Sequence, residues 1–154
     1  TFGVMFTADQ EAAAREMSRV CRAGGRIGMA NWTANGFIGQ LFKTIGRHVP
    51  PPPNVCSPLE WASEARLSQL FGADASDISV SMRTFVFRYR SAQDWVDIWR
   101  DIYGPMNKAF EAVGTDGSDA LEADLVALAG RASSGGSRAM IVPAEYAEVI
   151  IRKR

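Results

Sequence analysis

The sequence has few of the side chains that bind metals or form disulfide bonds. Its 154 residues include two cysteines, Cys21 and Cys56, and one histidine, His48. Two cysteines in a chain of this length do not make the disulfide framework of a small secreted protein. A structural zinc site would need more cysteine and histidine ligands than the chain holds. We therefore expect free thiols, no metal site and a reducing compartment, by default the cytoplasm.

The sequence also lacks an excess of charge of either sign, and it lacks a long apolar run. Basic and acidic side chains number 17 each, which gives a formal net charge of zero. A neutral chain without a basic stripe does not have the electrostatic footprint of a nucleic-acid-binding protein. No stretch approaches the roughly 18 uninterrupted apolar residues of a membrane helix, and no signal peptide is recognisable. We expect neither nucleic acid nor a membrane among the partners.

What the sequence does contain is the composition of a folded globular protein. Hydrophobic residues make up 47% of the chain and charged residues 22%. This balance allows a substantial core, and 154 residues are enough for one domain. We therefore predict a single domain over residues 1–154.

Capping residues and hydrophobic periodicity predict the elements of the first half of the chain. Thr7 and Gln10 have the form of a capping box that begins a helix, and this helix ends at Gly24-Gly25. A short, small and apolar strand follows over residues 26–31, as in a buried parallel sheet. A second helix follows Asn35, and a third is predicted from the cap at Ser57 to about residue 71.

The second half of the chain alternates in the same way. A long strand is predicted over residues 78–89 and a long helix after Ser91, with a kink at Gly104-Pro105. A shorter helix should open at Ser118, and the chain should end in a strand over residues 139–151. The order of helices and strands predicts an α/β fold.

Two segments resemble a known family of enzymes. They are Phe2-Gly-Val-Met-Phe6 and, after a helix, Val20-Cys-Arg-Ala-Gly-Gly-Arg-Ile-Gly-Met-Ala-Asn-Trp32. Both resemble the middle of a class I S-adenosylmethionine (SAM)-dependent methyltransferase, of the small-molecule kind typified by ubiquinone and menaquinone biosynthesis. The resemblance implies the C-terminal part of a Rossmann-like sheet: strands 5 and 6, with strand 7 antiparallel between them. It also implies a substrate-chamber insertion over residues 35–75.

The cofactor-binding half of such an enzyme is missing from this sequence. A nucleotide-type site in an open α/β sheet needs a glycine-rich turn after the first strand and an acidic residue about 20 positions further on. The chain has neither, because Gly24-Gly25 precedes a strand and Gly135-Gly136 lies between serines. The resemblance implies SAM as the cofactor, with Thr1 and Phe2 at the rim of its site.

The resemblance also implies where an acceptor would bind. Gly3, Met5 and Phe6 would border the acceptor chamber, although the two apolar side chains could simply be core. Asn31 and Trp32 lie at the carboxyl end of a strand, where ligands bind in open α/β sheets. The alternative for Trp32 is packing under the next helix, and Trp32→Ala should weaken acceptor binding without unfolding the domain if the functional interpretation holds.

The predicted insertion supplies the remaining candidates. Its apolar chamber would be lined by Phe37, Leu41, Phe42 and Trp61, and the alternative for these residues is again the core. His48 is the candidate general base, because a histidine titrates near neutral pH, and the alternative is a surface role. Other catalytic residues are unknown.

Two functional hypotheses follow. The first is the substrate-side half of a SAM-dependent methyltransferase that acts on a small, fairly apolar acceptor and is inactive without the N-terminal half. The second is a non-enzymatic module for small-molecule binding or dimerisation, derived from the same fold. In that case the open edge of the first strand would be covered by a second copy in a homodimer.

Overall fold

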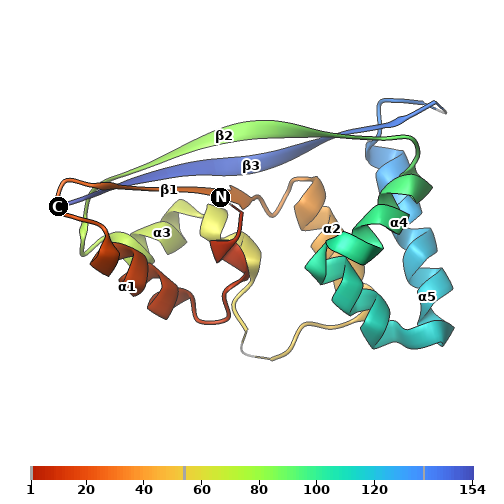
Figure 1. Ribbon diagram of the computed structural model, residues 1–154, viewed down its shortest axis with the longest axis horizontal. Helices are drawn as coiled ribbons and strands as arrows, with labels where there is room; N and C mark the ends of the chain where they lie inside the picture. The colour runs from red at the N-terminus through yellow and green to blue at the C-terminus, as the bar shows by residue number, and fades with distance from the viewer. Residues whose placement is uncertain (1, 54, 137) are drawn as a thin grey trace. The chain divides into compact units, whose positions relative to one another are not determined.

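The computed structural model describes residues 2–53, 55–136 and 138–154, and it has the α/β class that the sequence predicts (Figure 1). The helices are α1 (Gln10–Val20), α2 (Phe37–His48), α3 (Glu64–Phe71), α4 (Ala92–Ile102) and α5 (Gly104–Ala132), with two short 3-10 helices, η1 (Val4–Phe6) and η2 (Pro58–Ala62). The strands are β1 (Arg26–Trp32), β2 (Ala75–Tyr89) and β3 (Met140–Lys153).

The three strands form a sheet in which the last strand lies in the middle. The order is β1-β3-β2, and β1 pairs antiparallel with β3 from Arg26 opposite Arg152 to Trp32 opposite Tyr146. Strand β2 also runs opposite to β3 (Figure 1). A last strand that is antiparallel and central is therefore confirmed. Strand β1, whose composition suggested a strand of a parallel sheet, pairs only in the antiparallel sense within the part of the chain that the structure describes.

The chain divides into two compact units. Unit 1 comprises Thr1–Gly36, Asn54–Thr84 and Glu145–Arg154, and unit 2 comprises Phe37–Pro53 and Phe85–Ala144. Strands β2 and β3 each contribute to both. The single domain and the insertion over residues 35–75 remain predictions.

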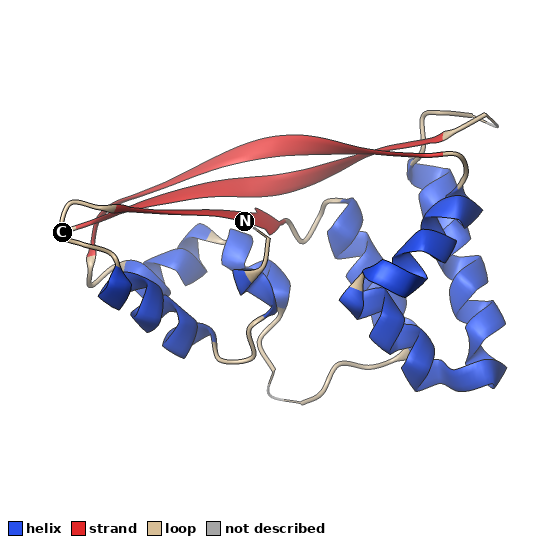
Figure 2. Ribbon diagram, viewed as in Figure 1, coloured by secondary structure: helices blue, strands red, loops and turns tan. Residues whose placement is uncertain are grey.

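Unit 1 packs its helices on one face of the strands. Helices α1 and α3 lie on the same side of the sheet (Figure 2). Alternate residues of β3, among them Ala147, Val149 and Ile151, are buried, as expected for a strand with one covered face. The side chain of Lys153 links the end of β3 to α1. Its Nζ donates to the carbonyl oxygens of Ser18 and Cys21 at the C-terminus of α1.

The predicted capping box at the first helix is wrong. Asp9, not Thr7, is the N-cap of α1, and its carboxylate accepts a hydrogen bond of 2.8 Å from the backbone N–H of Ala12. The hydroxyl of Thr7 instead donates to the carbonyl of Val4 and closes η1. Thr7 follows a short helix that was not predicted from the sequence. Its hydroxyl is bonded to the carbonyl of Val4 in that helix, so it does not cap α1.

The predicted helix from Ser57 to residue 71 is two helices. Ser57 caps η2, with Pro58 in its first turn, and Ser63 then caps α3. The break arises because Ser63 has an extended backbone (φ −92°, ψ 125°) and accepts from the N–H of Arg66. The predicted end near Gly72 is confirmed.

In unit 2, helices α2 and α4 both pack against α5. The predicted cap Ser91 is confirmed, since its Oγ accepts from the N–H of Asp94 at 3.0 Å. The predicted kink at Gly104-Pro105 is a full break at Tyr103, after which α5 begins. The predicted helix start at Ser118 is wrong, because the second break lies at Gly114, whose φ of 64° favours glycine. None of the helices in the described ranges has both the length and the hydropathy for crossing a membrane.

Candidate functional site

The carboxyl end of β1 brings together residues from three separate segments of unit 1. The ring of Phe2 stacks on Trp32, with ring centroids 4.1 Å apart and an interplanar angle of 17°. Tyr146, the register partner of Trp32, meets both rings edge-on. We call Phe2, Trp32 and Tyr146 the terminal aromatic cluster. It holds the N-terminal segment against the strand end where the sequence analysis placed the acceptor.

A carboxylate that the sequence analysis missed lies at the same strand end. The hydroxyl of Thr33 donates to Oε1 of Glu145 at 2.8 Å and accepts from the N–H of Gly36. Thr33 is buried, whereas Glu145 is exposed. A fixed, solvent-facing carboxylate can take a proton from a ligand. Its position follows from the pairing of Trp32 with Tyr146, and that register is the only signal that could have revealed it.

Two of the predicted acceptor residues contact each other in the interior of unit 1. Asn31 is 0% exposed and donates from Nδ2 to the backbone oxygen of Trp61 at 3.0 Å. Trp61 is also 0% exposed. Within the described ranges, Oδ1 of Asn31 and Nε1 of Trp61 have no hydrogen-bond partner. An unsatisfied buried polar group costs about 1–3 kcal/mol, so this pair is an unusual feature of the core.

The other predicted residues of unit 1 differ in burial. Met5 is fully buried, Gly3 is exposed and Phe6 is 40% exposed. Trp32 is only 7% exposed, because Phe2 covers it. The predicted cofactor contact Thr1 lies outside the described residues.

The predicted chamber residues of the second helix belong to unit 2. Phe37 and Leu41 are buried, and Phe42 is half-buried. The ring of Phe37 lies 5.3 Å from that of Trp95 and 6.2 Å from that of Phe87, measured between centroids. Phe37 and Leu41 therefore fill the core of unit 2, and an apolar chamber lined by them remains a prediction.

His48 takes part in an ion-pair cluster that links α2 to α5. Its Nε2 lies 2.8 Å from Oδ2 of Asp124, and the guanidinium of Arg47 lies 3.4 Å from the same oxygen. The hydrogen bond from His48, with a smaller contribution from Arg47, lowers the pKa of the Asp124 carboxyl. Because its partner is a carboxylate of the same unit, His48 serves here to join two helices.

Replacing Asp124 with asparagine should reduce stability at neutral pH but not in acid. A carboxyl whose pKa is lowered by folding stabilises the folded state above its unfolded pKa of about 4, and this contribution disappears as the pH falls through the lower folded value. Asp124 is only half-buried, so water screens the pair and we expect a fall in melting temperature of at most about 2 °C. Thermal unfolding of Asp124→Asn and the parent chain between pH 3 and pH 7 measures the difference. A gap that persists at pH 3 would contradict this account.

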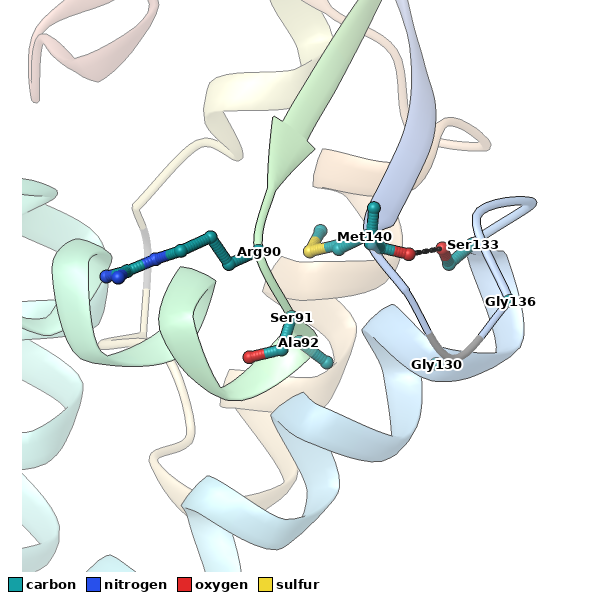
Figure 3. A pocket seen from close by; sticks show the side chains of 8 residues that line it. Arg90, Ser91, Ala92, Gly130, Ser133, Gly136 and Met140 are labelled. Atoms are coloured by element: carbon teal, nitrogen blue, oxygen red, sulfur yellow. Dashed lines mark hydrogen bonds between the residues drawn. The ribbon is translucent and has the colours of Figure 1, made fainter.

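A cavity of about 280 Å³ lies in unit 2, where β2 leads into α4 and α5 leads towards β3 (Figure 3). It contains none of the predicted site residues, and its lining is Arg90, Ser91, Ala92, Gly130, Ser133, Gly136, Ala139 and Met140. The guanidinium of Arg90 points away from Met140 and Ser133 (Figure 3) and forms an ion pair of 2.6 Å with Asp94. Ser133 uses its hydroxyl to accept from the N–H groups of Gly135 and Ile141. The polar side chains of the lining are therefore engaged within the protein.

The described residues do not fit SAM by themselves. The predicted contact Phe2 has one face of its ring covered by Trp32. The chain has no glycine-rich turn after a strand and no acidic residue spaced for ribose hydroxyls. Residues of this chain could at most form the edge of such a site.

The described part of the chain has neither a disulfide bond nor a group of side chains that could hold a metal ion. Cys21 is half-buried, Cys56 is exposed, and both are free thiols, as expected. In the portion of the chain described by the structure, no three His, Cys, Asp or Glu residues gather in a group that could hold a metal ion.

The chain is similar to longer mycobacterial proteins. It is 35% identical over 160 residues to the uncharacterized protein Rv1405c of Mycobacterium tuberculosis and to the uncharacterized protein Mb1440c of Mycobacterium bovis, and each match covers 99% of this chain and 56% of the relative. A second uncharacterized protein of M. tuberculosis, Rv1403c, is 36% identical over 115 residues, which cover 73% of this chain and 42% of that protein. No protein-family model matches the chain. The chain thus spans little more than half the length of the first of these curated relatives.

Proposed function

We propose that this chain is the acceptor-binding part of a SAM-dependent methyltransferase that acts on a small, fairly apolar molecule. The observation that carries the proposal is the stack of Phe2 on Trp32. It joins the two segments on which the resemblance rests, at the carboxyl end of β1. The central, antiparallel position of β3 supports the same proposal, because the resemblance implies that order of strands.

The chemistry available at this strand end suits the acceptor side of a methyl transfer. Such a transfer depends mainly on the alignment of the acceptor's nucleophilic atom, with a base as an option. The terminal aromatic cluster offers apolar surface, and Glu145, held by Thr33, offers a carboxylate that can take a proton. Residues outside this chain would hold the cofactor.

A chimera tests this proposal. The matched segment of the M. tuberculosis protein Rv1405c is replaced with residues 1–154, and binding of S-adenosylhomocysteine is measured by isothermal titration calorimetry. We expect micromolar binding by the full-length relative and by the chimera, and none by the 154-residue chain alone. If the folded relative and the folded chimera both fail to bind the nucleoside, the proposal is wrong.

A dimerisation module is the second candidate, and the edge of β1 favours it. Strand β1 pairs with β3 on one side, and within the described ranges no strand pairs with its other edge. An open edge is an aggregation liability unless something covers it. Sedimentation equilibrium measures whether the chain forms a dimer. A stable dimer, together with a chimera that does not bind S-adenosylhomocysteine, would favour the dimerisation module over the methyltransferase.

A further inference from the structure

Two arginines lie directly opposite each other where β1 begins. Arg26, the first residue of β1, has Arg152 of β3 as its register partner, and both residues are exposed. Partners in an antiparallel pair project from the same face of a sheet, with Cβ atoms about 5 Å apart, and like charges in this position destabilise the pairing. We call Arg26 and Arg152 the arginine pair, and the repulsion between its members opposes the folding of unit 1.

No carboxylate neutralises the arginine pair. Within the described ranges, neither guanidinium forms an ion pair, and this holds also for the nearby Asp74 and Asp77 at the start of β2. The next carboxylate on the same face of β3 is that of Glu148, which pairs with Arg83 at 3.1 Å. Glu148 is four residues from Arg152, or about 13 Å along a strand. Two positive charges therefore stand together without a counter-charge.

The arginine pair lies on the face of the sheet that α1 and α3 leave uncovered. These two helices lie on the same side of the sheet (Figure 2), and the buried Ile151 faces them, so its neighbour Arg152 projects from the other side. The next register partners on that side are Gly28 and Ile150. Ile150 is 38% exposed, and Gly28 has no side chain to cover it. The arginine pair thus borders a small, exposed apolar surface.

We propose that the arginine pair binds the phosphate group of a small phosphate monoester, whose organic part lies against Gly28 and Ile150. Such a phosphate carries nearly two negative charges at neutral pH, and its three oxygens accept from guanidinium N–H groups. One phosphate can therefore bridge both arginines and remove their repulsion. A carboxylate carries one charge and two oxygens, which match a single guanidinium.

The surroundings favour a small molecule over a membrane or a nucleic acid. Anionic membranes attract clusters of about four to eight basic residues, and nucleic acids bind along an extended basic surface. This chain has a formal net charge of zero, and Glu148 lies on the same face as the arginine pair. The site is at the opposite end of β1 from the terminal aromatic cluster, about 20 Å along the strand, and it is independent of the proposed function.

Phenyl phosphate is the probe for this site, and inorganic phosphate and benzoate are compared with it at one ionic strength. In the 15N-labelled chain, the Nε–H signals of Arg26 and Arg152 are assigned from their loss in Arg26→Gln and Arg152→Gln. Both should shift and saturate with phenyl phosphate. Each substitution should weaken binding about tenfold, because it removes a charged hydrogen-bond donor. Benzoate should bind about tenfold more weakly, and inorganic phosphate, which has no ring to place on Ile150, about threefold more weakly.

Arg88→Gln is the matched control variant. Arg88 is an exposed arginine of β2 in unit 2, and its guanidinium donates to the carbonyl of Val86. This substitution removes the same charge from the chain but should leave phenyl phosphate binding within about twofold. The proposal is overturned if phenyl phosphate leaves both arginine signals unmoved, if benzoate or inorganic phosphate binds as tightly, or if all three substitutions weaken binding alike.

Thermal unfolding gives a second measurement, which also works without the ligand. Because Arg26→Gln and Arg152→Gln relieve the repulsion, each should raise the melting temperature by about 1–2 °C. Each should also lose most of the stabilisation that saturating phenyl phosphate gives the parent chain. If both substitutions instead lower the melting temperature without the ligand, the two side chains support the fold, and the proposal is overturned.

Vesicles separate a small phosphate monoester from a lipid headgroup of the same chemistry. The chain should not sediment with vesicles of phosphatidylcholine and phosphatidic acid in equal parts, because two arginines are too few for stable binding to a membrane. Sedimentation with these vesicles that Arg26→Gln abolishes and Arg88→Gln retains would assign the phosphate to a membrane and overturn the small-molecule proposal.

Discussion

Replacing Trp95 with alanine should lower the melting temperature of the chain by about 10 °C, because the loss of a large buried side chain leaves a cavity that costs about 3–5 kcal/mol. Trp95 is 0% exposed, and its ring meets those of Phe37 and Trp99, both with centroids 5.3 Å away. It therefore connects α2 with α4. Thermal unfolding followed by circular dichroism measures the change.

The same helix provides the control for this prediction. Ile102 lies at the end of α4 and is 73% exposed. Ile102→Ala removes apolar atoms that are already in water, so its melting temperature should stay within about 2 °C of the parent value. Equal effects of the two substitutions would show that the aromatic contacts of Trp95 do not support unit 2.

Much of the fold could be predicted because local signals decide it. The caps at Ser57 and Ser91 and the end at Gly72 follow from the chemistry of single side chains, and all three are confirmed. The errors arose where a second local signal competed with the first. Both Thr7 and Asp9 are possible N-caps, and Asp9 is the one that caps α1. Gly114 has a positive φ, so the long helix is interrupted there and not at Ser118.

The candidate site was predictable only in part, because it depends on pairing between distant segments. Asn31 and Trp32 could be predicted from the rule that ligands bind at the carboxyl ends of strands. Glu145 could not, because it reaches Thr33 only through the register between β1 and β3. The contact of Asn31 with Trp61 likewise joins residues 30 positions apart, and neither side chain carries a local signal for it.

Replacing Trp32 with alanine should both destabilise unit 1 and free the N-terminal segment. The sequence alone predicts a loss of acceptor binding without unfolding. The structure changes that expectation, because Trp32 is only 7% exposed and carries the stacked ring of Phe2. Loss of the indole removes this stack and the edge contact with Tyr146, so we expect a fall in melting temperature of about 10 °C.

Hydrogen exchange separates the anchoring of the segment from general destabilisation. The N–H groups of Phe6 and Thr7 donate to the carbonyls of Gly3 and Val4, and both bonds belong to η1. They should exchange faster in Trp32→Ala, while the N–H of Tyr103 in unit 2, which donates to the carbonyl of Trp99, keeps its rate. Trp32→Phe retains an aromatic face for Phe2 and should show a smaller fall in melting temperature and smaller increases in the exchange rates of Phe6 and Thr7. If Trp32→Ala instead keeps its melting temperature and its exchange rates, the stack with Phe2 does not hold the N-terminal segment, and the original interpretation of Trp32 as a residue outside the core is restored.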